Sequence, residues 1–331
     1  MKVLVTGGCG YIGAHVARAL EKSGHQPVIL DDLRRARSGR EGKFPLEKIP
    51  LEDAAAVLAV FEKHRPEAVI HLAGYISVGE SVKFPEMYWE NNLRASASLL
   101  FACARFPVKS FLFSSTAAVY GNVAKVPIPE TSPYAPTCPY GSSKLEFERL
   151  LHQGGKTLGF RSFALRYFNA AGVWVPWGVG EDHDPEEHLI PRVVRAIREG
   201  RKVQVYGKDY PTPDGTCVRD YIHVLDLASA HVKVIESAAL QGGQSFNVGT
   251  GSGFSVLEVI RTVGDYLKVK PDIEFLPRRP GDPPSLVADA SLLRRSLDWK
   301  PEHSSLQEIV SSAADWEKIR SQQSPGAAPC H

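Results

Sequence analysis

Short apolar runs alternate with longer stretches of helical periodicity along the first half of the chain. Runs of strand length lie at residues 2–6, 27–30, 68–72, 110–114 and 161–165. Between them, apolar residues recur at helical spacing from about 13 to 23, 54 to 64, 91 to 105 and from Tyr140 onward. Strand–helix units of this length predict a parallel sheet that helices cover on both faces. We therefore expect a doubly wound α/β fold.

A glycine-rich loop follows the first predicted strand directly and opens the first helix. Glycines at positions 7, 10 and 13 let the turn close, let backbone N–H groups approach a pyrophosphate and let helix and strand pack closely. The second strand ends at Asp31, the position expected for an acid that binds an adenosine ribose. This combination predicts a dinucleotide-binding domain of the Rossmann type.

The residues after the second strand bear on the choice of dinucleotide. Asp31 and Asp32 favour NAD over NADP, because the 2′-phosphate of NADP would meet a carboxylate. Arg34, Arg35 and Arg37 weaken this preference, since an arginine here could bind that phosphate. We expect NAD as the cofactor.

A second glycine-rich run, at residues 249–253, also follows an apolar segment. Ser255 and Glu258 have the spacing of a capping box. The run therefore predicts a turn into a helix rather than a second phosphate loop.

Tyr140 and Lys144 form the candidate catalytic pair. A spacing of four residues places a phenol and an ammonium one turn apart on the same face of a helix. A nearby cation lowers the pKa of a phenol from about 10 toward neutrality, as a tyrosine needs in order to take an alcohol proton at pH 7. Tyr266 and Lys270 repeat the spacing, but only Tyr140 begins a helix of the predicted sheet.

Three more segments, at residues 71–74, 114–116 and 166–169, follow predicted strands. Ligands of parallel sheets collect beyond the carboxyl ends of the strands. Each segment carries a hydroxyl, an amide or a tight backbone suited to contacts with a cofactor or a sugar. A hydroxyl at such a position is nevertheless more often a cap or turn residue.

Charge and cysteine content exclude several classes of function. The chain has 39 basic and 37 acidic residues and a net charge of +2, so there is no electrostatic case for binding nucleic acid. Five scattered cysteines without C-x-x-C spacing indicate a reducing compartment and argue against structural zinc. No apolar run approaches the ~20 residues of a membrane span, and the 11 histidines lack the spacing of H-E-x-x-H. We predict a soluble, cytoplasmic protein without a metal.

Together these motifs resemble the extended short-chain dehydrogenase/reductases and, within them, the UDP-glucose 4-epimerase family. The general motifs are the glycine-rich loop, Ser115-Thr116 before Val119-Tyr120-Gly121, the Tyr140 and Lys144 pair, and the run from Leu165 to Asn169. The more specific ones lie at residues 71–74, 78–81, 180–183, 188–191, 209–212 and 215–224. The resemblance extends from residue 1 to about residue 316.

The resemblance implies an epimerisation through a bound 4-keto sugar, with NAD retained. Tyr140 would take the proton of the sugar 4-hydroxyl while C4 passes hydride to NAD. Lys144 would lower the Tyr140 pKa and bind the nicotinamide ribose, and Thr116 would hydrogen-bond the same sugar hydroxyl. Related 4,6-dehydratases carry an Asp-Glu pair directly after the Thr, where this chain has Ala117 and Ala118. Without those acids, we expect the ketone only to be reduced back.

Two sets of binding residues are implied by the same resemblance. The cofactor set comprises Gly7, Gly10, Tyr11, Ile12, Gly13, Asp31, Asp32, Leu33, Arg34, Leu51, Leu72, Ala73, Gly74, Tyr75, Asn91, Ser114, Tyr140, Lys144 and Phe168. The substrate set comprises Thr116, Tyr140, Asn169, His188, Leu189, Tyr206, Arg219, Arg279, Asp282 and Leu286.

Within the substrate set, Arg219 and Arg279 are expected on the diphosphate, because forked guanidinium donors pair with phosphate oxygens. Tyr206 is expected under the uracil and Asp282 on the uridine ribose. For Arg219, an internal ion pair with Asp220 or another acid is the alternative.

Several positions depart from the family pattern. Pro50-Leu51 stands where many members have an acid beside the adenine, and Ile76 replaces a lysine that contacts the cofactor. Leu286 replaces a bulky tyrosine that limits the sugar pocket in some relatives, so an N-acetyl group could fit. The apolar loop with Trp174 and Trp177 could line the pocket or cover a neighbouring loop, and packing is the favoured role.

The implied organisation is an NAD-binding domain at residues 1–168, to which elements near 222–249 return. Residues 169–320 would form mainly a smaller C-terminal α/β subdomain for the nucleotide sugar. Residues 321–331 are small, polar and rich in Pro and Gly, and are predicted to be disordered. The helices at 91–105 and after Tyr140 form a dimer bundle in the family, so we expect a homodimer, although core packing alone would give the same apolar stripes.

The leading interpretation is the interconversion of UDP-glucose and UDP-galactose. A 4-epimerase of UDP-N-acetylglucosamine, a UDP-pentose or UDP-glucuronate is the alternative. More remote alternatives are a non-catalytic NAD-binding sensor with the same fold and a dehydrogenase that oxidises or reduces its substrate in a net reaction.

Overall fold

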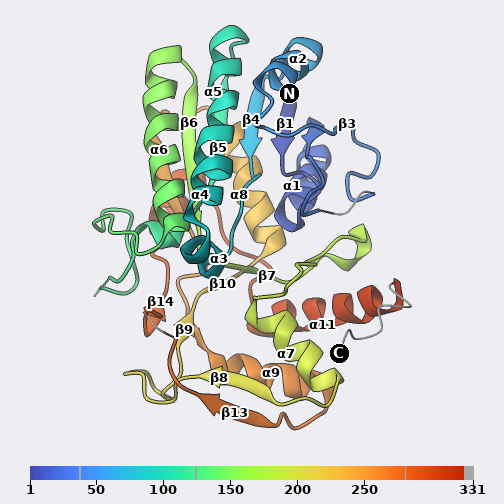
Figure 1. The fold of residues 1–331 in the computed structure, drawn as a ribbon, viewed down its shortest axis with the longest axis vertical. Coiled ribbons are helices and arrows are strands. Elements are labelled where there is room, and N and C mark those ends of the chain that lie inside the picture. The colour runs from blue at the N-terminus through green and yellow to red at the C-terminus, as the bar shows by residue number, and fades with distance from the viewer. Residues whose placement is uncertain (37–38, 124, 280, 324–331) are drawn as a thin grey trace.

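A seven-stranded parallel sheet forms the centre of the larger domain (Figure 1). The computed structural model describes residues 1–36, 39–123, 125–279 and 281–323. The strands run in the order β3, β2, β1, β4, β5, β6 and β11, with bounds Leu46–Glu47, Gln26–Leu30, Lys2–Thr6, Ala68–His71, Ser110–Thr116, Arg161–Tyr167 and Gln244–Val248. The strand order reverses between β1 and β4, which is where such sheets bind ligands. The predicted doubly wound α/β fold is confirmed.

Helices cover both faces of this sheet (Figure 1). α1 (Tyr11–Lys22) and α8 (Val224–Glu236) enclose one buried cluster with the strands. α2 (Ala54–His64), α5 (Ser96–Arg105) and α6 (Pro139–Leu158) enclose a second cluster.

Strand β1 shows how the sequence produces these two layers. Val3 and Val5 belong to the cluster that contains side chains of α1 and α8, while Leu4 belongs to the other. Neighbouring residues of a strand point to opposite faces of the sheet. The continuous apolar run is therefore explained by burial of both faces.

The segment before β5 differs from the single helix predicted at residues 91–105. It consists of α3 (Val78–Lys83), α4 (Pro85–Trp89) and a π-helical turn (Glu90–Ala95) before α5 begins. Single π turns occur frequently at functional sites. This one buries Asn92.

A smaller α/β unit with its own core follows (Figure 1). Its helices are α7 (Leu189–Arg198), α9 (Val256–Leu267) and α11 (Leu306–Gln323). They pack with a parallel pair of strands, β8 (Val203–Tyr206) and β13 (Ile273–Leu276). The predicted capping box of Ser255 and Glu258 starts α9.

Short strands occupy the junction between the two domains (Figure 1). β7 (Asn169–Ala171) pairs with β10 (Tyr221–His223). β9 (Val218–Arg219) lies between β12 (Phe254–Ser255) and β14 (Ser285–Leu286). Three of the predicted substrate residues lie on these strands.

Late parts of the chain return to the larger domain. α8 and β11 come from the predicted region near 222–249. Another segment that returns to the larger domain was not predicted. Leu293 of α10 (Ser291–Leu297) and Trp299, which comes after this helix, both belong to the buried cluster with α1 and α8. Isolated apolar residues in this stretch do not indicate which domain will bury them.

The predicted disordered tail begins inside a helix. Ser321 to Gln323 belong to α11, so disorder was the wrong prediction for these three residues. Residues 324–331 lie outside the described part of the chain.

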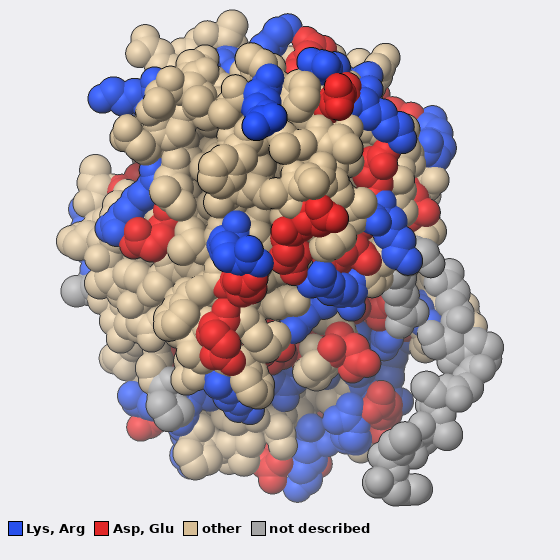
Figure 2. Space-filling model, turned by 45° about the horizontal axis from the view of Figure 1, so that its top comes forward, with Lys and Arg blue, Asp and Glu red and all other residues tan. Residues whose placement is uncertain are grey.

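Acidic and basic side chains are interspersed over the described surface that Figure 2 shows. This distribution agrees with the small net charge of the chain. Among the helices of the described residues, none combines the length and the hydropathy that a bilayer span requires.

Candidate active site

The glycine-rich loop forms a tight cradle at the start of α1. Gly10 is the N-cap residue, and no described side chain caps the helix. The first backbone N–H groups can therefore bind an anion such as a pyrophosphate. Gly7 has a φ of +67°, and a Cβ at Gly13 would lie 2.1 Å from the Gly7 carbonyl oxygen, so neither position tolerates a side chain.

Asp31 lies at the carboxyl end of β2 and is 8% exposed. Its Oδ2 accepts a hydrogen bond from the backbone nitrogen of Cys9 at 3.0 Å, and its Oδ1 accepts one from that of Leu33 at 2.9 Å. Burial raises the pKa of the Asp31 carboxyl, and these hydrogen bonds oppose that shift. The acid is fixed beside the loop, as the ribose contact requires.

Two of the arginines that could have bound the 2′-phosphate of NADP form ion pairs with glutamates. Arg34 Nη1 donates to Glu52 Oε1 at 2.7 Å. Arg35 donates two hydrogen bonds to Glu80, at 2.8 and 3.0 Å. Arg37 lies outside the described residues. These pairings favour NAD, because a 2′-phosphate would have to compete with a carboxylate for either guanidinium.

The other predicted cofactor residues near the cradle come after the carboxyl ends of β1, β2, β3 and β4, either on the connecting loops or, after β1, in the first turn of α1. They are Tyr11, Ile12, Asp32, Leu33, Leu51, Leu72 and Ala73.

Asn92 fixes the backbone that follows β4. Its Oδ1 accepts a hydrogen bond from Tyr75 N at 2.8 Å, and its Nδ2 donates to Tyr75 O at 2.9 Å. A Cβ at Gly74 would lie 3.0 Å from Asn92 Oδ1 and 3.3 Å from Lys144 Nζ. The role of Asn91 in binding the cofactor stays a prediction. Sequence reasoning missed Asn92, because helical periodicity does not reveal a π turn.

Tyr140 and Thr116 meet beyond the carboxyl end of β5. Tyr140 is the second residue of α6, after Pro139, and Cys138 caps the helix. The hydroxyl of Thr116 is close enough to the Tyr140 phenol to lower its pKa, and Thr116 Oγ1 accepts a hydrogen bond from Ala118 N at 3.1 Å. Burial raises the pKa of Tyr140 to about 12, while the hydrogen bond from Thr116 acts to lower it.

Lys144 lies one turn further along α6 and is 2% exposed. Its Nζ donates to Ser114 O at 3.1 Å and lies 4.8 Å from the centre of the Phe113 ring. Burial lowers the pKa of Lys144 to about 8, against the charge of Glu148. The predicted effect of Lys144 on the pKa of Tyr140 stays a prediction.

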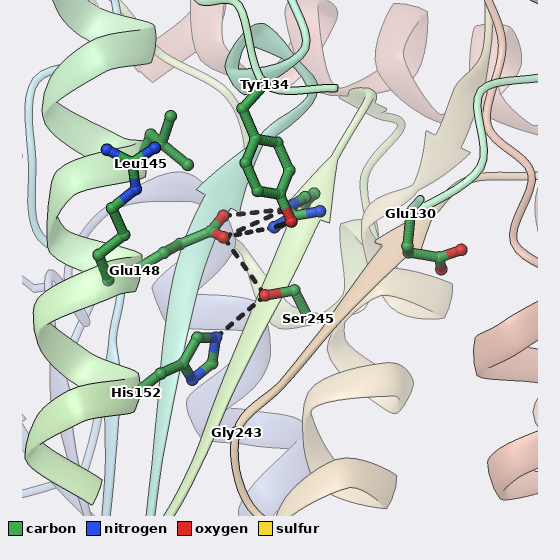
Figure 3. Close-up of a pocket in the computed structure, with 9 residues that line it drawn as sticks. Glu130, Tyr134, Leu145, Glu148, His152, Gly243 and Ser245 are labelled. Carbon is green, nitrogen blue, oxygen red and sulfur yellow. Dashed lines mark hydrogen bonds and ion pairs between the residues drawn. The ribbon is translucent and has the colours of Figure 1, made fainter. Parts of the chain in front are cut away.

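A buried ion pair joins the next turn of α6 to β6 (Figure 3). Arg166 donates to both carboxylate oxygens of Glu148, with Nη2 to Oε2 at 2.6 Å and Nε to Oε1 at 3.0 Å. The hydroxyls of Ser115 and Ser245 also donate to this carboxylate. A cavity of about 220 Å³ lies beside it, lined in part by His152. Sequence reasoning missed this pair. The one sequence signal was that Glu148 follows Lys144 by four residues and so lies on the same helix face.

Two predicted substrate residues pair with each other in the smaller domain. Arg219 Nη2 donates to Asp282, and its Nη1 donates to Val218 O at 2.8 Å. Asp220 instead accepts a hydrogen bond from Thr250 N at 2.8 Å. The alternative of an ion pair with another acid is therefore observed, and the acid is Asp282.

Tyr206 and Arg279 are also in contact. The Arg279 guanidinium lies 4.0 Å from the centre of the Tyr206 ring. Its neighbour Arg278 donates instead to Asp209 Oδ1 at 2.7 Å. Of the two adjacent arginines, Arg279 is the one that lies against the residue predicted under the uracil.

The remaining predicted substrate residues of the smaller domain lie at element ends. Asn169 opens β7, and its Nδ2 donates to Asp220 O at 3.0 Å. His188 is the N-cap residue of α7 and Leu189 is the first residue of that helix. The ring of His188 faces Glu181, with Nδ1 and Oε1 at 2.6 Å.

Leu286 and Phe168 pack against the same buried cluster, which includes Val119. Val119 ends a short 3-10 turn (Ala117–Val119) that begins directly after Thr116. Leu286, from the predicted substrate set, thus lies near Phe168, from the predicted cofactor set.

The loop with Trp174 and Trp177 packs against α1. Trp174 N donates to His15 Nε2 at 3.3 Å, and the rings of His15 and Trp177 lie 5.6 Å apart. Lys22 Nζ lies 4.9 Å from the centre of the Trp177 ring. These contacts support the packing role.

Comparison with known proteins places the chain in a family. Residues 3–249 match the NAD dependent epimerase/dehydratase family. A UDP-glucose 4-epimerase of Azospirillum brasilense is 44% identical over 330 residues, which cover 99% of this chain and 94% of that protein. The chain belongs to this family.

Solved epimerase structures share the fold over most of the chain. The UDP-glucose-4-epimerase of Stenotrophomonas maltophila, with bound NAD and formylated UDP-arabinopyranose, has a TM-score of 0.93, 38% identity and coverage of 98% of this chain and 100% of that one. The UDP-Glc/GlcNAc 4-epimerase of Campylobacter jejuni has a TM-score of 0.82, 38% identity and coverage of 96% and 99%. NAD is the cofactor of this epimerase family, and the glycine cradle and Asp31 fit it.

Proposed function

We propose that this epimerase interconverts UDP-glucose and UDP-galactose through a bound 4-keto sugar. The observation that carries the proposal is the contact of Tyr140 with Thr116 beyond β5, where alanines occupy the next two positions. This arrangement supports the removal and return of a proton at one hydroxyl. It offers no acid at those positions to eliminate water, so the ketone is reduced back.

Tyr140 carries the proton step in this proposal. Its phenolate accepts the proton of the sugar 4-hydroxyl and later returns it to the same oxygen. Bound NAD supplies the hydride acceptor and donor for C4. Thr116 favours the phenolate by hydrogen-bonding it, which acts against the effect of burial on the Tyr140 pKa. Because the hydride returns to the opposite face of the ketone, the configuration at C4 is inverted. Since proton and hydride both return, the net reaction is redox-neutral.

Lys144 is proposed to bind the nicotinamide ribose and to supply positive charge near the phenol. With a pKa of about 8, it is largely protonated at pH 7. The hydrogen bond to Ser114 O holds its ammonium on the side of α6 that faces β5.

The smaller domain is proposed to bind mainly the nucleotide sugar. Arg219 pairs with Asp282, and we propose that a diphosphate takes over this guanidinium and leaves Asp282 for the uridine ribose. Arg279 would complete the diphosphate site beside Tyr206.

The test is to incubate the purified protein with a panel of UDP sugars, without added NAD, and to separate the products. We expect UDP-glucose and UDP-galactose to interconvert without consumption of external NADH. Tyr140→Phe should lower kcat by about 10²–10⁴-fold, because it removes the proton acceptor. A wild-type protein that leaves every sugar of the panel unaltered would contradict the proposal.

A second candidate substrate is UDP-N-acetylglucosamine. Leu286 is smaller than the tyrosine of some relatives, and the similar protein of Campylobacter jejuni is named for both sugars. We expect Leu286→Tyr to reduce turnover of the N-acetylated sugar at least about 10-fold relative to UDP-glucose, since a clash of a few kcal/mol is enough. Absence of detectable N-acetylated turnover in the wild type would rule this candidate out, and UDP-pentose and UDP-glucuronate are tested by the same panel.

We also propose a homodimer in a reducing, cytoplasmic location. Phe101 on α5 is 70% exposed and Leu150 on the neighbouring α6 is 46% exposed, so these helices offer apolar contacts to a second copy. Four cysteines of the described residues are buried free thiols, as expected in a reducing compartment.

A further inference from the structure

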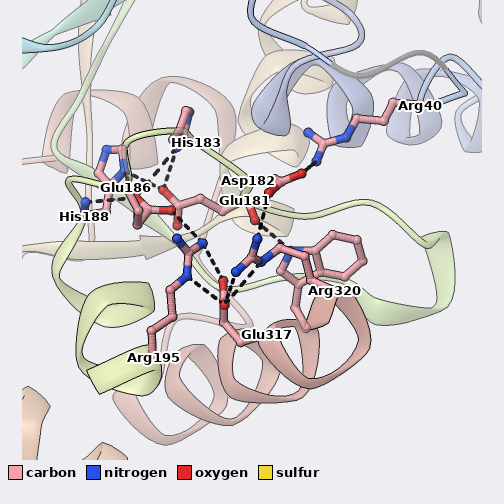
Figure 4. A network of polar contacts seen from close by, with 10 residues as sticks. Arg40, Glu181, Asp182, His183, Glu186, His188, Arg195, Glu317 and Arg320 are labelled. Carbon is pink, nitrogen blue, oxygen red and sulfur yellow. Dashed lines mark hydrogen bonds and ion pairs between the residues drawn. The ribbon is translucent and has the colours of Figure 1, made fainter. Parts of the chain in front are cut away.

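Two histidines and two glutamates converge in the segment that leads into α7 (Figure 4). They are Glu181, His183, Glu186 and His188, and one ligand atom of each lies within 4.8 Å of the others. The spacing in sequence is E-x-H-x-x-E-x-H, which differs from H-E-x-x-H. The irregular backbone between β7 and α7 brings the four side chains together.

The distances between these atoms are close to those of a tetrahedral metal site. The Nδ1 of His188 lies 2.6 Å from Glu181 Oε1 and 3.1 Å from Glu186 Oε1. The Nδ1 of His183 lies 3.3 Å from Glu181 Oε1 and 3.9 Å from Glu186 Oε1. Ligands bound to Zn²⁺ at about 2.0–2.1 Å would stand about 3.3 Å apart. Shifts of well under 1 Å would bring all four of these distances to that value.

His183 supplies an independent observation. Its Nδ1 is buried and pairs with Glu181 Oε1 at 3.3 Å, but without the geometry of a hydrogen bond to any described residue. A buried ring nitrogen paired in this way is incompletely satisfied. Because this nitrogen faces both carboxylates, a cation between them would satisfy it.

The surroundings provide a second shell and an entry path. Arg195 Nη2 donates to Glu186 Oε2 at 3.3 Å, and Arg195 is itself held by Glu317 at 2.8 and 2.9 Å. The side chains of Glu181 and Glu186 are 7% and 4% exposed, whereas those of His183 and His188 are 30% and 43% exposed. The carboxylate of Glu186 is thus held in place, and an ion could enter from the side of the histidines.

We propose that Glu181, His183, Glu186 and His188 form a structural site for a divalent transition-metal ion, with Zn²⁺ as the preferred ion. Imidazole and carboxylate ligands suit Zn²⁺, and four protein ligands leave no open position for chemistry. Two neutral imidazoles and two carboxylates also balance the charge of the ion. The bound metal would tie the loop before α7 together.

A protonated histidine is the competing occupant of this site. A proton on His188 would be shared with Glu181 and Glu186, which lie 2.6 and 3.1 Å from its Nδ1. The two occupants compete, so metal affinity should fall as the pH is lowered.

The experiment measures metal binding directly and needs no sugar substrate, so it is independent of the proposed function. The full chain is dialysed against EDTA and then titrated with Zn²⁺ in competition with a chromophoric chelator. We expect one Zn²⁺ per chain, a higher Tm in the presence of Zn²⁺, and the visible absorption of tetrahedral Co²⁺ when cobalt is used instead. His183→Ala and Glu186→Gln should each weaken binding by at least about 10-fold.

His303→Ala is the matched control. His303 also forms an ion pair with a glutamate, at 2.7 Å from Glu308, but at a separate and more exposed place. This variant should bind Zn²⁺ like the wild type. The inference is overturned if the EDTA-treated wild type binds no Zn²⁺ or Co²⁺, or if His183→Ala and the wild type bind equally well.

Discussion

The residues of the candidate active site follow one face of α6 at intervals of four. Tyr140 lies at its start, and Lys144, Glu148 and His152 follow on successive turns. The first two face the reaction in the proposed function, and the next two belong to the buried network with Arg166. The proposed catalytic residues and the buried residues that hold α6 in place thus share one helix face. Single substitutions on this face can therefore test the structural residues separately.

Glu148→Gln should destabilise the protein by about 3–5 kcal/mol, because it leaves the buried guanidinium of Arg166 without its counter-charge. The free energy of unfolding from urea titrations measures this loss. The matched control is Glu146→Gln, which removes an exposed pair with Arg149 on the same helix and should cost less than about 1 kcal/mol. Equal losses in the two variants would show that burial of the Glu148 pair does not matter.

At the scale of elements, α1 and α8 pack on the same face of the sheet, and each buries a histidine against its own backbone. His15 Nδ1 lies 2.9 Å from Tyr11 O, and His231 Nδ1 lies 2.8 Å from Leu227 O. Burial lowers the pKa of both His15 and His231 to about 4. Both rings are therefore neutral in the folded protein at neutral pH.

These histidines predict acid sensitivity. An unfolded chain takes up their protons near pH 6.5, but the folded chain does so only near pH 4. The unfolded state therefore binds more protons between these values, and stability present above pH 6.5 is lost as the pH falls toward 4.

His231→Gln should flatten the dependence of the urea midpoint on pH between 6.5 and 4, because Gln does not titrate. An unchanged slope in His231→Gln would contradict the assignment.

Several helix and strand positions could be predicted because their patterns are local. The strand at residues 2–6 and the helix at 54–64 have the predicted bounds. The helix predicted at 91–105 was in part wrong, since the π-helical turn (Glu90–Ala95) has a wider period than the pattern assumes. Asn92 was missed for this reason.

At the scale of the whole molecule, the exposed apolar residues of α5 and α6 bear on assembly. Phe101→Glu should convert the proposed homodimer into a monomer, because it places a charge at the centre of an apolar contact. Size-exclusion chromatography with light scattering gives the mass. Phe275→Glu, at an exposed position of β13 in the smaller domain, should keep the wild-type mass. A wild-type protein that is already monomeric would refute the proposed dimer.

Local patterns were enough to predict the parallel sheet, the glycine cradle and the placement of Tyr140 and Lys144 on one helix. Each of these follows from periodicity or spacing within about one element, which a linear chain displays directly. The pairing of Arg219 with Asp282, the pairing of Glu148 with Arg166 and the convergence of four side chains before α7 became visible in the folded chain alone. These contacts depend on how loops and separate elements fold back on one another, and no local pattern encodes that geometry.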